Sequence, residues 1–399
     1  MPDEPFTLFD SVLGPTRYHL NIGAPSPPWL KRMAELMVDV TPKRLADEQS
    51  AAANGRPDAF LKSGYQDRSS TKCIVYCDQL TYFLGVEMLK KMEFTPARKK
   101  TAWTLKNLEQ QLERDLPNVE DDRKAGRFSA AFYGIPTFHN PTGIVLSERK
   151  CKELVRLARK FNLLPLLRRR LQLSFSYSEG PIPKRLFAYD DPNDADYDGG
   201  HVISNGTFSK LLSPALRLGW MELPLRIKEK HWINSPILHS SGSLNTYTGG
   251  LVAELLHSGV AAEHIAAVRA EQKTKMAAAV RILEEGAARR LPPREQAEGL
   301  SAAACNRVIP SVQGGYFMYV RLPKEVNSTE AARYLKEKYD VGVVDGRRCL
   351  VGEEASGQSE EAVENGIRLS IAYPPLEEVE EGFRLVCKAL NELLTQSSA

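Results

Sequence analysis

The most reactive pattern in the sequence surrounds a lysine that follows a short β-rich segment. Thr207 and Ser209 precede Lys210, and Arg217 follows it seven residues later. An amine can form a Schiff base with an aldehyde, hydroxyl groups can donate hydrogen bonds to a phosphate, and a guanidinium can bind a phosphate through two parallel hydrogen bonds. The pattern therefore suits a Schiff base beside a phosphate group. Taken alone, it is more often a surface lysine with a structural arginine.

Composition and other motifs exclude several classes of function. The sequence contains neither the GxGxxG of dinucleotide-binding folds nor the GxxxxGK[ST] of P-loop proteins. Its 53 Lys and Arg residues nearly balance its 50 Asp and Glu residues, so no basic face predicts nucleic-acid binding. The six cysteines form no CxxC pair and have no metal-ligand spacing with the seven histidines. This pattern favours free thiols in a reducing compartment and no bound metal.

The length and the apolar segments predict a two-domain globular protein. The 399 residues are 42% hydrophobic and 26% charged, which is ordinary globular composition. The first residues are acidic and lack the basic and apolar regions of a secretory or transit peptide. No apolar run approaches the ~20 residues that a membrane-spanning helix needs. We therefore expect a cytoplasmic protein that does not associate with membranes.

From about residue 73, short β-rich segments alternate with helical ones. Helices are predicted where apolar residues recur three and four positions apart, at 84–92, after the turn at 140–143, and at 262–285, 328–339 and 376–394. Strands are predicted at 73–76, 130–135, 202–204, 218–221, 314–320 and 367–371. The polar segment 44–60 is interpreted as a loop. Such alternation indicates an α/β fold with a mostly parallel sheet that is covered on both faces.

Three motifs occur in an order and spacing that identify a family. They are FHNPTG at 138–143, GTFSKLLSPALRLGW at 206–220 and GIRLS at 366–370. Together they resemble pyridoxal-phosphate-dependent aminotransferases of fold type I, class I/II, from about residue 73 to the end. With LNTYTGG at 244–250, the second motif is most similar to the eukaryotic branch related to 2-aminoadipate and aromatic aminotransferases.

This resemblance implies a domain arrangement and an assembly. We expect an N-terminal arm and part of the small domain over 1–45, and a large domain that binds pyridoxal 5'-phosphate (PLP) over 46–280. Its central sheet should be mostly parallel. A smaller α/β domain is expected over 281–399. Members usually form homodimers with sites at the interface, so a homodimer is expected here.

The resemblance also assigns roles around the lysine. Lys210 would form the Schiff base with PLP and move a proton between the substrate Cα and the cofactor. Arg217, Thr207 and Ser209 would hold the cofactor phosphate.

Three further residues match positions that contact the cofactor or the substrate. Asn140 would bond the ring oxygen, and Tyr82 would stack on the pyridine, although Leu80 replaces the proline usual in that motif. Arg368 would bind the substrate α-carboxylate through a bidentate pair. The structural alternatives are a turn-forming asparagine, a core tyrosine and a strand-edge salt bridge. His139 is interpreted as structural, and no second residue can be assigned to a substrate side chain.

The segment after the helix that ends at Phe161, where the family has an apolar strand, departs from the family pattern. The family has Asp-Asp/Glu-Val-Tyr, whose aspartate pairs with the pyridinium nitrogen, but this chain has Arg168 and Leu171 at those positions, and Pro165 within the strand. A cation beside the ring nitrogen disfavours its protonation. Three interpretations stay open: a solvated basic loop, an arginine partner of the ring nitrogen with different electronics, or a compensated double frameshift over about 165–175. The codons GAC GAC GTC TAC AAC, read one nucleotide early and preceded by C or A, encode the Arg-Arg-Arg-Leu-Gln found at 168–172.

A second departure concerns the first third of the chain. The segment 21–27 resembles the family's N-terminal loop on the substrate side. Between it and Tyr82 the family normally has a Tyr-Gly segment that reaches the partner subunit and a turn that caps the phosphate with backbone N–H groups. Neither is identifiable in this shortened region, around 45–72, where 68–72 is at best a weak substitute.

The expected activity is transamination between an L-amino acid and a 2-oxo acid such as 2-oxoglutarate. The alternative is a catalytically impaired or non-catalytic homologue, because Arg and Leu replace the Asp/Tyr pair at 168–171. A lyase or decarboxylase on the same scaffold also stays open.

Overall fold

The core of the chain is a large sheet built from residues 74–222. The computed structural model describes residues 16–21, 23–39, 74–78, 80–85, 95–96, 105–168, 176–177, 184–233, 245–288, 314–351 and 365–397. Among these, six strands pair in the order β3-β2-β4-β5-β6-β7, and every pair is parallel except the antiparallel β6–β7. The strands are β2 (Ile74–Cys77), β3 (Thr95–Pro96), β4 (Ala130–Gly134), β5 (Leu163–Arg168), β6 (Ile203–Thr207) and β7 (Gly219–Glu222). The predicted mostly parallel sheet is confirmed.

Helices pack on this sheet through the predicted apolar faces. The helices that precede and follow β4 are α4 (Leu105–Asp115), α5 (Val119–Lys124) and α6 (Glu148–Phe161). On α6 the apolar residues spaced three and four apart are buried against α4 and β4. The helix ends at Asn162, which takes the left-handed conformation and donates from its amide to the Arg127 carbonyl at 2.6 Å. This ending places β5 directly after the helix.

Pro165 lies inside β5, as the sequence indicated. It is paired with Phe132 in the middle of the sheet, and it has no N–H to donate to the ladder. Arg168 is the last residue of β5 and pairs with Asn205 of β6. The strand therefore forms despite the proline. Its last residue, Arg168, lies at the carboxyl edge of the large sheet, which is where ligands bind to parallel sheets.

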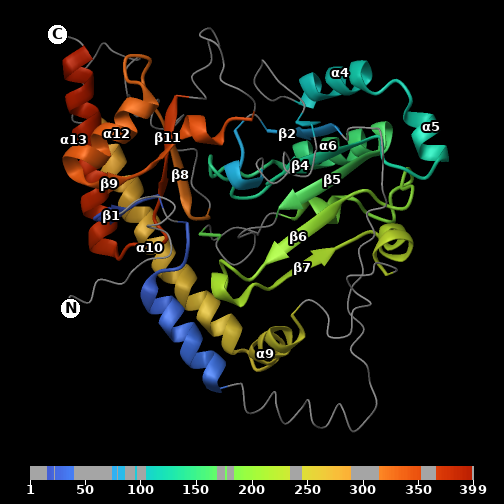
Figure 1. Cartoon of the computed structure of the whole chain (residues 1–399), viewed down its shortest axis with the longest axis horizontal. Coiled ribbons are helices and arrows are strands. Elements are labelled where there is room, and N and C mark those ends of the chain that lie inside the picture. The colour runs from blue at the N-terminus through green and yellow to red at the C-terminus, as the bar shows by residue number, and fades with distance from the viewer. Residues whose placement is uncertain are drawn as a thin grey trace.

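The C-terminal part forms a second unit around a small antiparallel sheet. Its strands lie in the order β10 (Val344–Asp345), β11 (Gly366–Ser370) and β8 (Phe317–Arg321). The flanking helices are α10 (Val260–Ala288), α12 (Ser328–Tyr339) and α13 (Leu376–Ser397). Figure 1 shows this unit at one end of the molecule and the large sheet at the other, with α10 extending from one toward the other. The predicted domain limits remain a prediction, and the boundary at 280/281 falls within α10.

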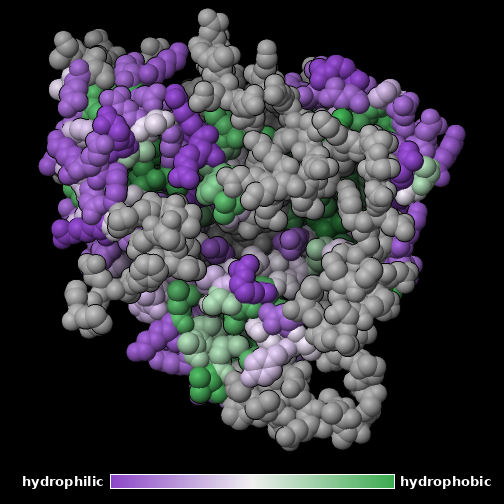
Figure 2. Space-filling model, viewed as in Figure 1, coloured by the Kyte–Doolittle hydropathy of each residue, from purple (hydrophilic) through white to green (hydrophobic). Residues whose placement is uncertain are grey.

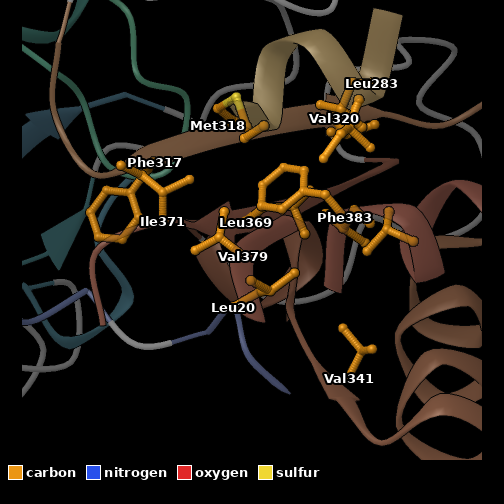
Figure 3. Packing of buried hydrophobic residues seen from close by; sticks show 14 of the residues in the cluster. Leu20, Leu283, Phe317, Met318, Val320, Val341, Leu369, Ile371, Val379 and Phe383 are labelled. Atoms are coloured by element: carbon orange, nitrogen blue, oxygen red, sulfur yellow. The ribbon is translucent and has the colours of Figure 1, made fainter. Parts of the chain in front are cut away.

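The N-terminal segment joins this second unit. Strand β1 (Tyr18–His19) pairs in parallel with β9 (Val341–Gly342). Figure 3 shows the packing that results, in which side chains from β8, β11, α10 and α13 meet the N-terminal Leu20 in one apolar cluster. Burial of this surface stabilises the placement of the segment 18–21, although it lies more than 300 residues from β9 and β11 in the sequence.

Some helices were not predicted from the sequence. A helix spans 27–39, and α9 spans Thr246–His257. Prolines 27 and 28 and glycines 249 and 250 resemble helix breakers, but proline is tolerated in a first turn and the α9 glycines are compensated by buried leucines. The short elements are η1 (Leu186–Tyr189), η2 (Pro214–Leu216), α7 (Leu225–Ile227), η3 (Lys228–Trp232) and η4 (Gly346–Cys349).

Other features of the sequence analysis fall partly outside the described residues. The loop expected at 44–60 lies there, as does most of the helix expected at 84–92, of which residues 84 and 85 are described and helical. Of the described helices, none alone is long and apolar enough to cross a bilayer. The consecutive helices α9 and α10 meet that test of length and composition only as a pair, bent by 78°. Figure 2 shows hydrophilic side chains over α12 and α13 and over α4 and α5.

Candidate functional site

The predicted carboxylate-binding arginine is a buried cation. Arg368 lies in the middle of β11 and is 4% exposed. Its guanidinium donates to Oδ1 of Asn140 at 3.0 Å and to the carbonyl of Asn21 at 2.7 Å. Its Nε is buried without a hydrogen-bond partner, and no described carboxylate lies within ion-pair distance. Burial lowers the pKa of Arg368 to about 10. The strand-edge salt bridge considered from the sequence is therefore not formed by the described residues.

Asn140 belongs to a tightly bonded turn after β4. The peptide bond to Pro141 is cis, Phe138 has a positive φ, and the Gly143 N–H donates to the His139 carbonyl at 2.6 Å. Because Arg368 donates to Oδ1, the amide orientation is fixed by the network, and Nδ2 is buried with no partner. The Asn140 side chain thus presents an unused donor beside a buried cation.

Two further residues complete this cluster, and the sequence analysis assigned no role to the first of them, Phe317. The Phe317 ring lies under the Arg368 guanidinium, 4.4 Å from ring centroid to Cζ. The segment 21–27, identified as the substrate-side loop, supplies the Asn21 carbonyl. A Cβ at Gly23 would collide with the Phe317 ring, so only glycine allows this close approach. We refer to Asn21, Asn140, Phe317 and Arg368 as the Arg368 cluster.

The predicted lysine and phosphate-binding residues lie where β6 ends. The Thr207 hydroxyl donates to Ser209 Oγ at 2.9 Å and accepts from the Ser209 N–H at 3.1 Å. Lys210 follows in a turn and is partly buried. Arg217 has a positive φ and an exposed side chain that donates to the Pro214 carbonyl at 3.1 Å. The hydroxyl groups of Thr207 and Ser209 are therefore in contact, whereas the Arg217 guanidinium bonds to the turn that precedes it in the chain.

Tyr316 connects the lysine segment with the Arg368 cluster. Its hydroxyl donates to the Lys210 carbonyl at 2.9 Å, and the next residue is Phe317. Tyr316 is fully buried, and burial raises the pKa of its hydroxyl well above its usual value. The hydroxyl is therefore a permanent donor that fixes the backbone at Lys210. No pattern in the sequence pointed to this role.

Tyr82 reaches the same region through a contact between the two units. The Thr81 N–H donates to the Cys349 carbonyl at 2.9 Å, and Leu80 forms a β-bridge with Leu350. Tyr82 and Cys349 both lie close enough to Arg368 to influence its charge. The structure thus brings Asn140 and Arg368 into contact and places Tyr82 within electrostatic range of Arg368. The Tyr82 ring is tilted by 50° to the ring of Phe83, at 5.5 Å between centroids.

His139 is buried between Thr142 and Asp78. Its Nδ1 lies 2.8 Å from the Thr142 hydroxyl, and its Nε2 lies 3.4 Å from Asp78 Oδ2, without hydrogen-bond geometry. It lines a cavity of about 230 Å³ at the carboxyl ends of β2, β4 and β5. None of the predicted site residues is among the residues that line this cavity.

The described residues bear only partly on the predictions for metal ligands, cysteines and the segments that depart from the family pattern. Among the described residues no cluster of metal-binding side chains occurs, and Cys77, Cys151, Cys349 and Cys387 are free thiols. The backbone places Arg168 at the end of β5, where the family pattern has its acid. Leu171 and the segment 68–72 lie outside the described residues.

Comparison with known proteins supports the resemblance. Residues 71–385 match the family model described as aminotransferase class I and II. An aromatic-amino-acid aminotransferase from Thermococcus litoralis is 27% identical over 284 residues, which are 70% of this chain and 58% of that protein. An uncharacterised protein from Saccharomyces cerevisiae is 28% identical over 271 residues, 64% of this chain and 56% of that protein. The chain thus matches little more than half the length of these curated relatives.

A solved structure shows the same fold. The α-aminoadipate aminotransferase LysN from Thermus thermophilus, complexed with N-(5'-phosphopyridoxyl)-L-leucine, superposes with a TM-score of 0.63 at 22% identity. The match covers 94% of this chain and 92% of that one. PLP is the cofactor of the matched family, as the sequence predicted. With a family model that matches most of its length and an α/β fold shared with solved members, the chain belongs to the class I and II aminotransferases.

Proposed function

We propose that this protein transfers an amino group between an L-amino acid and a 2-oxo acid, with PLP bound at Lys210. The observation that carries the proposal is the buried guanidinium of Arg368, which neutral acceptors hold and no described carboxylate neutralises. A buried cation without a counter-charge is costly unless a ligand supplies one. A substrate α-carboxylate would supply it.

The residues around Lys210 fit PLP at two of its polar groups. The unpartnered Nδ2 of Asn140 is a donor suited to the ring oxygen, and the paired hydroxyls of Thr207 and Ser209 are suited to the phosphate. Arg217 would have to exchange its bond to Pro214 for the phosphate. At the ring nitrogen the fit is poorer, because Arg168 stands where the family has an acid.

Arg368 and Lys210 would then act at different atoms of the bound substrate. PLP, when bound, supplies an aldehyde for the substrate amine and a conjugated ring that accepts the electron pair from Cα. Arg368 would bind the α-carboxylate with Nε and the N–H groups left free by Asn140 and Asn21. Lys210 would take the proton from the substrate Cα and deliver it to C4′ of the cofactor; the Tyr316 hydroxyl fixes the backbone that carries this lysine.

A second candidate is a homologue that binds PLP but turns over poorly. Arg168 favours it, since a cation at this position opposes protonation of the ring nitrogen and weakens the electron sink. The two candidates predict different responses to substitution. Replacement of Arg168 by Asp together with Leu171 by Tyr should leave an efficient enzyme little changed, but should raise the turnover of an impaired one by at least an order of magnitude.

The deciding experiment combines spectra with turnover. Purified protein with saturating PLP should show a visible absorption band that borohydride removes and that Lys210→Ala lacks. Lys150→Ala, an exposed lysine on α6, is the matched control and should keep the band. Transfer of an amino group to 2-oxoglutarate, measured with a panel of amino acids, then separates the active enzyme from the impaired homologue. The absence of any band at saturating PLP would refute both.

The assembly and location that we propose follow from the sequence. A homodimer is the state expected of the family, and the cytoplasmic location rests on the expectation of free thiols in a reducing compartment. Analytical ultracentrifugation of the purified chain tests the first.

A further inference from the structure

The cavity lined by His139 lies against helix α6, on one face of the large sheet. Phe132 of β4, Leu167 of β5 and Leu154 of α6 line it, and all three belong to the same buried cluster between sheet and helix. Tyr133, the next residue after Phe132, belongs to the cluster on the opposite face, as the alternation of side chains along a strand requires. Because neither Lys210 nor the Arg368 cluster lines this cavity, it is distinct from the substrate site proposed above.

The size of the cavity suits one aromatic ring with a short extension. Its volume is about 230 Å³, whereas an apolar cavity of about 150 Å³ is large enough to hold benzene. The side chains that form its floor are apolar and buried, among them Phe132, Ile135 and Leu154. Ile144 also lines the cavity and is exposed, so the cavity opens to solvent on that side. An apolar group would therefore gain free energy by moving from water onto this floor.

The rim carries a carboxylate that no described lysine or arginine neutralises. Asp78 directly follows β2, and its Oδ2 lies 3.4 Å from Nε2 of His139. The other nitrogen of this buried imidazole lies 2.8 Å from the Thr142 hydroxyl, so the ring is held in place on both sides. The Asp78 side chain is 25% exposed. It therefore presents an accessible acceptor for a cationic group at the edge of the apolar floor.

Two cations line the same cavity from other elements. Arg321 is the last residue of β8, and Lys150 lies in the first turn of α6; both are exposed. No described carboxylate lies within ion-pair distance of either side chain. A guanidinium can bind a carboxylate through two parallel hydrogen bonds, and an ammonium adds a point charge. The cavity thus combines an apolar floor with charges of both signs.

We infer that this cavity binds a free α-amino acid with an aromatic or similarly large apolar side chain, at a site separate from Arg368. The ammonium group of the ligand contacts Asp78, its carboxylate contacts Arg321, and its side chain occupies the floor. A monocarboxylate leaves Asp78 without a partner, and a simple amine leaves Arg321 without one, so the zwitterion is preferred to both. The inference goes beyond the proposed function, because this binding requires neither PLP nor Lys210.

The test compares three ligands that share a phenyl ring and differ in their charged groups. Binding of L-phenylalanine, 3-phenylpropionate and 2-phenylethylamine to the purified full chain, with no added PLP, is measured by calorimetry. Arg368→Met is the background, because it removes the proposed α-carboxylate site. One L-phenylalanine should bind per chain, about tenfold more tightly than either other ligand, the gain expected of one charge-assisted contact at a partly exposed position. In the wild type, L-phenylalanine should bind at two sites per chain.

Each charged residue is then tested against the ligand that lacks its partner group. Asp78→Asn should weaken binding of L-phenylalanine about tenfold and leave that of 3-phenylpropionate unchanged. Arg321→Gln should weaken L-phenylalanine to the same extent and leave 2-phenylethylamine unchanged. Arg333→Gln, which changes an exposed arginine of α12 outside the cavity, is the matched control and should alter none of the affinities.

Two results would overturn the inference. One is an affinity for L-phenylalanine that does not exceed the affinities for the two singly charged ligands. The other is an affinity for L-phenylalanine that either Asp78→Asn or Arg321→Gln leaves unchanged. The proposed function fails separately, by absence of the PLP band and of turnover with every acceptor.

Discussion

Replacement of Arg368 by methionine distinguishes a substrate-binding cation from a structural one. Methionine is apolar and of similar length, so it removes the charge while filling much of the space on the Phe317 ring. If Arg368 binds a substrate carboxylate, its charge is buried without a counter-charge in the ligand-free fold. This burial is unfavourable in free energy, and the substitution removes it. If Arg368 instead forms a structural ion pair with an acid, the substitution leaves that acid unpaired and lowers the free energy of unfolding.

The structure gives the size of the two opposing effects. Burial lowers the pKa of Arg368 to about 10 from an ordinary 12.5, and at about 1.4 kcal/mol for each tenfold change this cost is about 3 kcal/mol. The substitution relieves it but leaves the Asn21 carbonyl and Asn140 Oδ1 without their donor, at about 1–3 kcal/mol each. The contact with Phe317 is largely kept, since a thioether also packs well on an aromatic ring. The two effects largely offset each other, so the free energy of unfolding should change by no more than about 3 kcal/mol.

Urea unfolding of the ligand-free protein, followed by circular dichroism, measures this change. Removing one partner of a buried ion pair instead costs about 3–5 kcal/mol. A second measurement adds pentanoate at about 100 times its Kd, which should stabilise the wild type by about 2.7 kcal/mol and leave Arg368→Met unaffected. A loss of more than about 3 kcal/mol, together with an unchanged response to pentanoate, would refute the reasoning.

Two further predictions concern parts of the fold away from this cluster. His264 is buried with neither ring nitrogen hydrogen-bonded, and burial, then the charge of Arg32, lowers its pKa to about 4. As the pH falls below about 6.5, this histidine takes up a proton in the unfolded state but not in the folded state. The free energy of unfolding is therefore highest above that pH and falls by up to about 3 kcal/mol toward pH 4. In His264→Phe the free energy of unfolding, measured with urea, should depend less on pH across this window, and an unchanged pH dependence would contradict the prediction. Asn327 caps α12 by accepting from the Thr329 and Glu330 N–H groups, so Asn327→Ala should lower the free energy of unfolding by about 1 kcal/mol, whereas no loss would mean that the cap is replaced by water.

Local patterns allowed much of the fold to be predicted from the sequence. The spacing of Cys151, Leu154, Val155 and Ala158 predicted α6, and these residues are buried on one face of it. The helix expected at 328–339 has those limits in the structure, because Asn327 caps its start and Asp340 ends it in the left-handed conformation. By contrast, the helix at 27–39 was not predicted, since its stability comes from tertiary contacts: Met33 is buried and the Trp29 indole bonds Glu271 of α10.

The sequence by itself determined the family, the cofactor and the residues to examine, because motifs such as those at 138–143 and 206–220 are contiguous and their spacing is readable. Only the tertiary structure decided which of those residues meet. Arg368 and the Asn21 carbonyl are 347 positions apart, and Arg368 and Asn140 are 228 positions apart. Whether a charge is buried, and what neutralises it, depends on surfaces brought together by folding. For that reason Arg368 could be named from the sequence, but its burial without a described counter-charge could not.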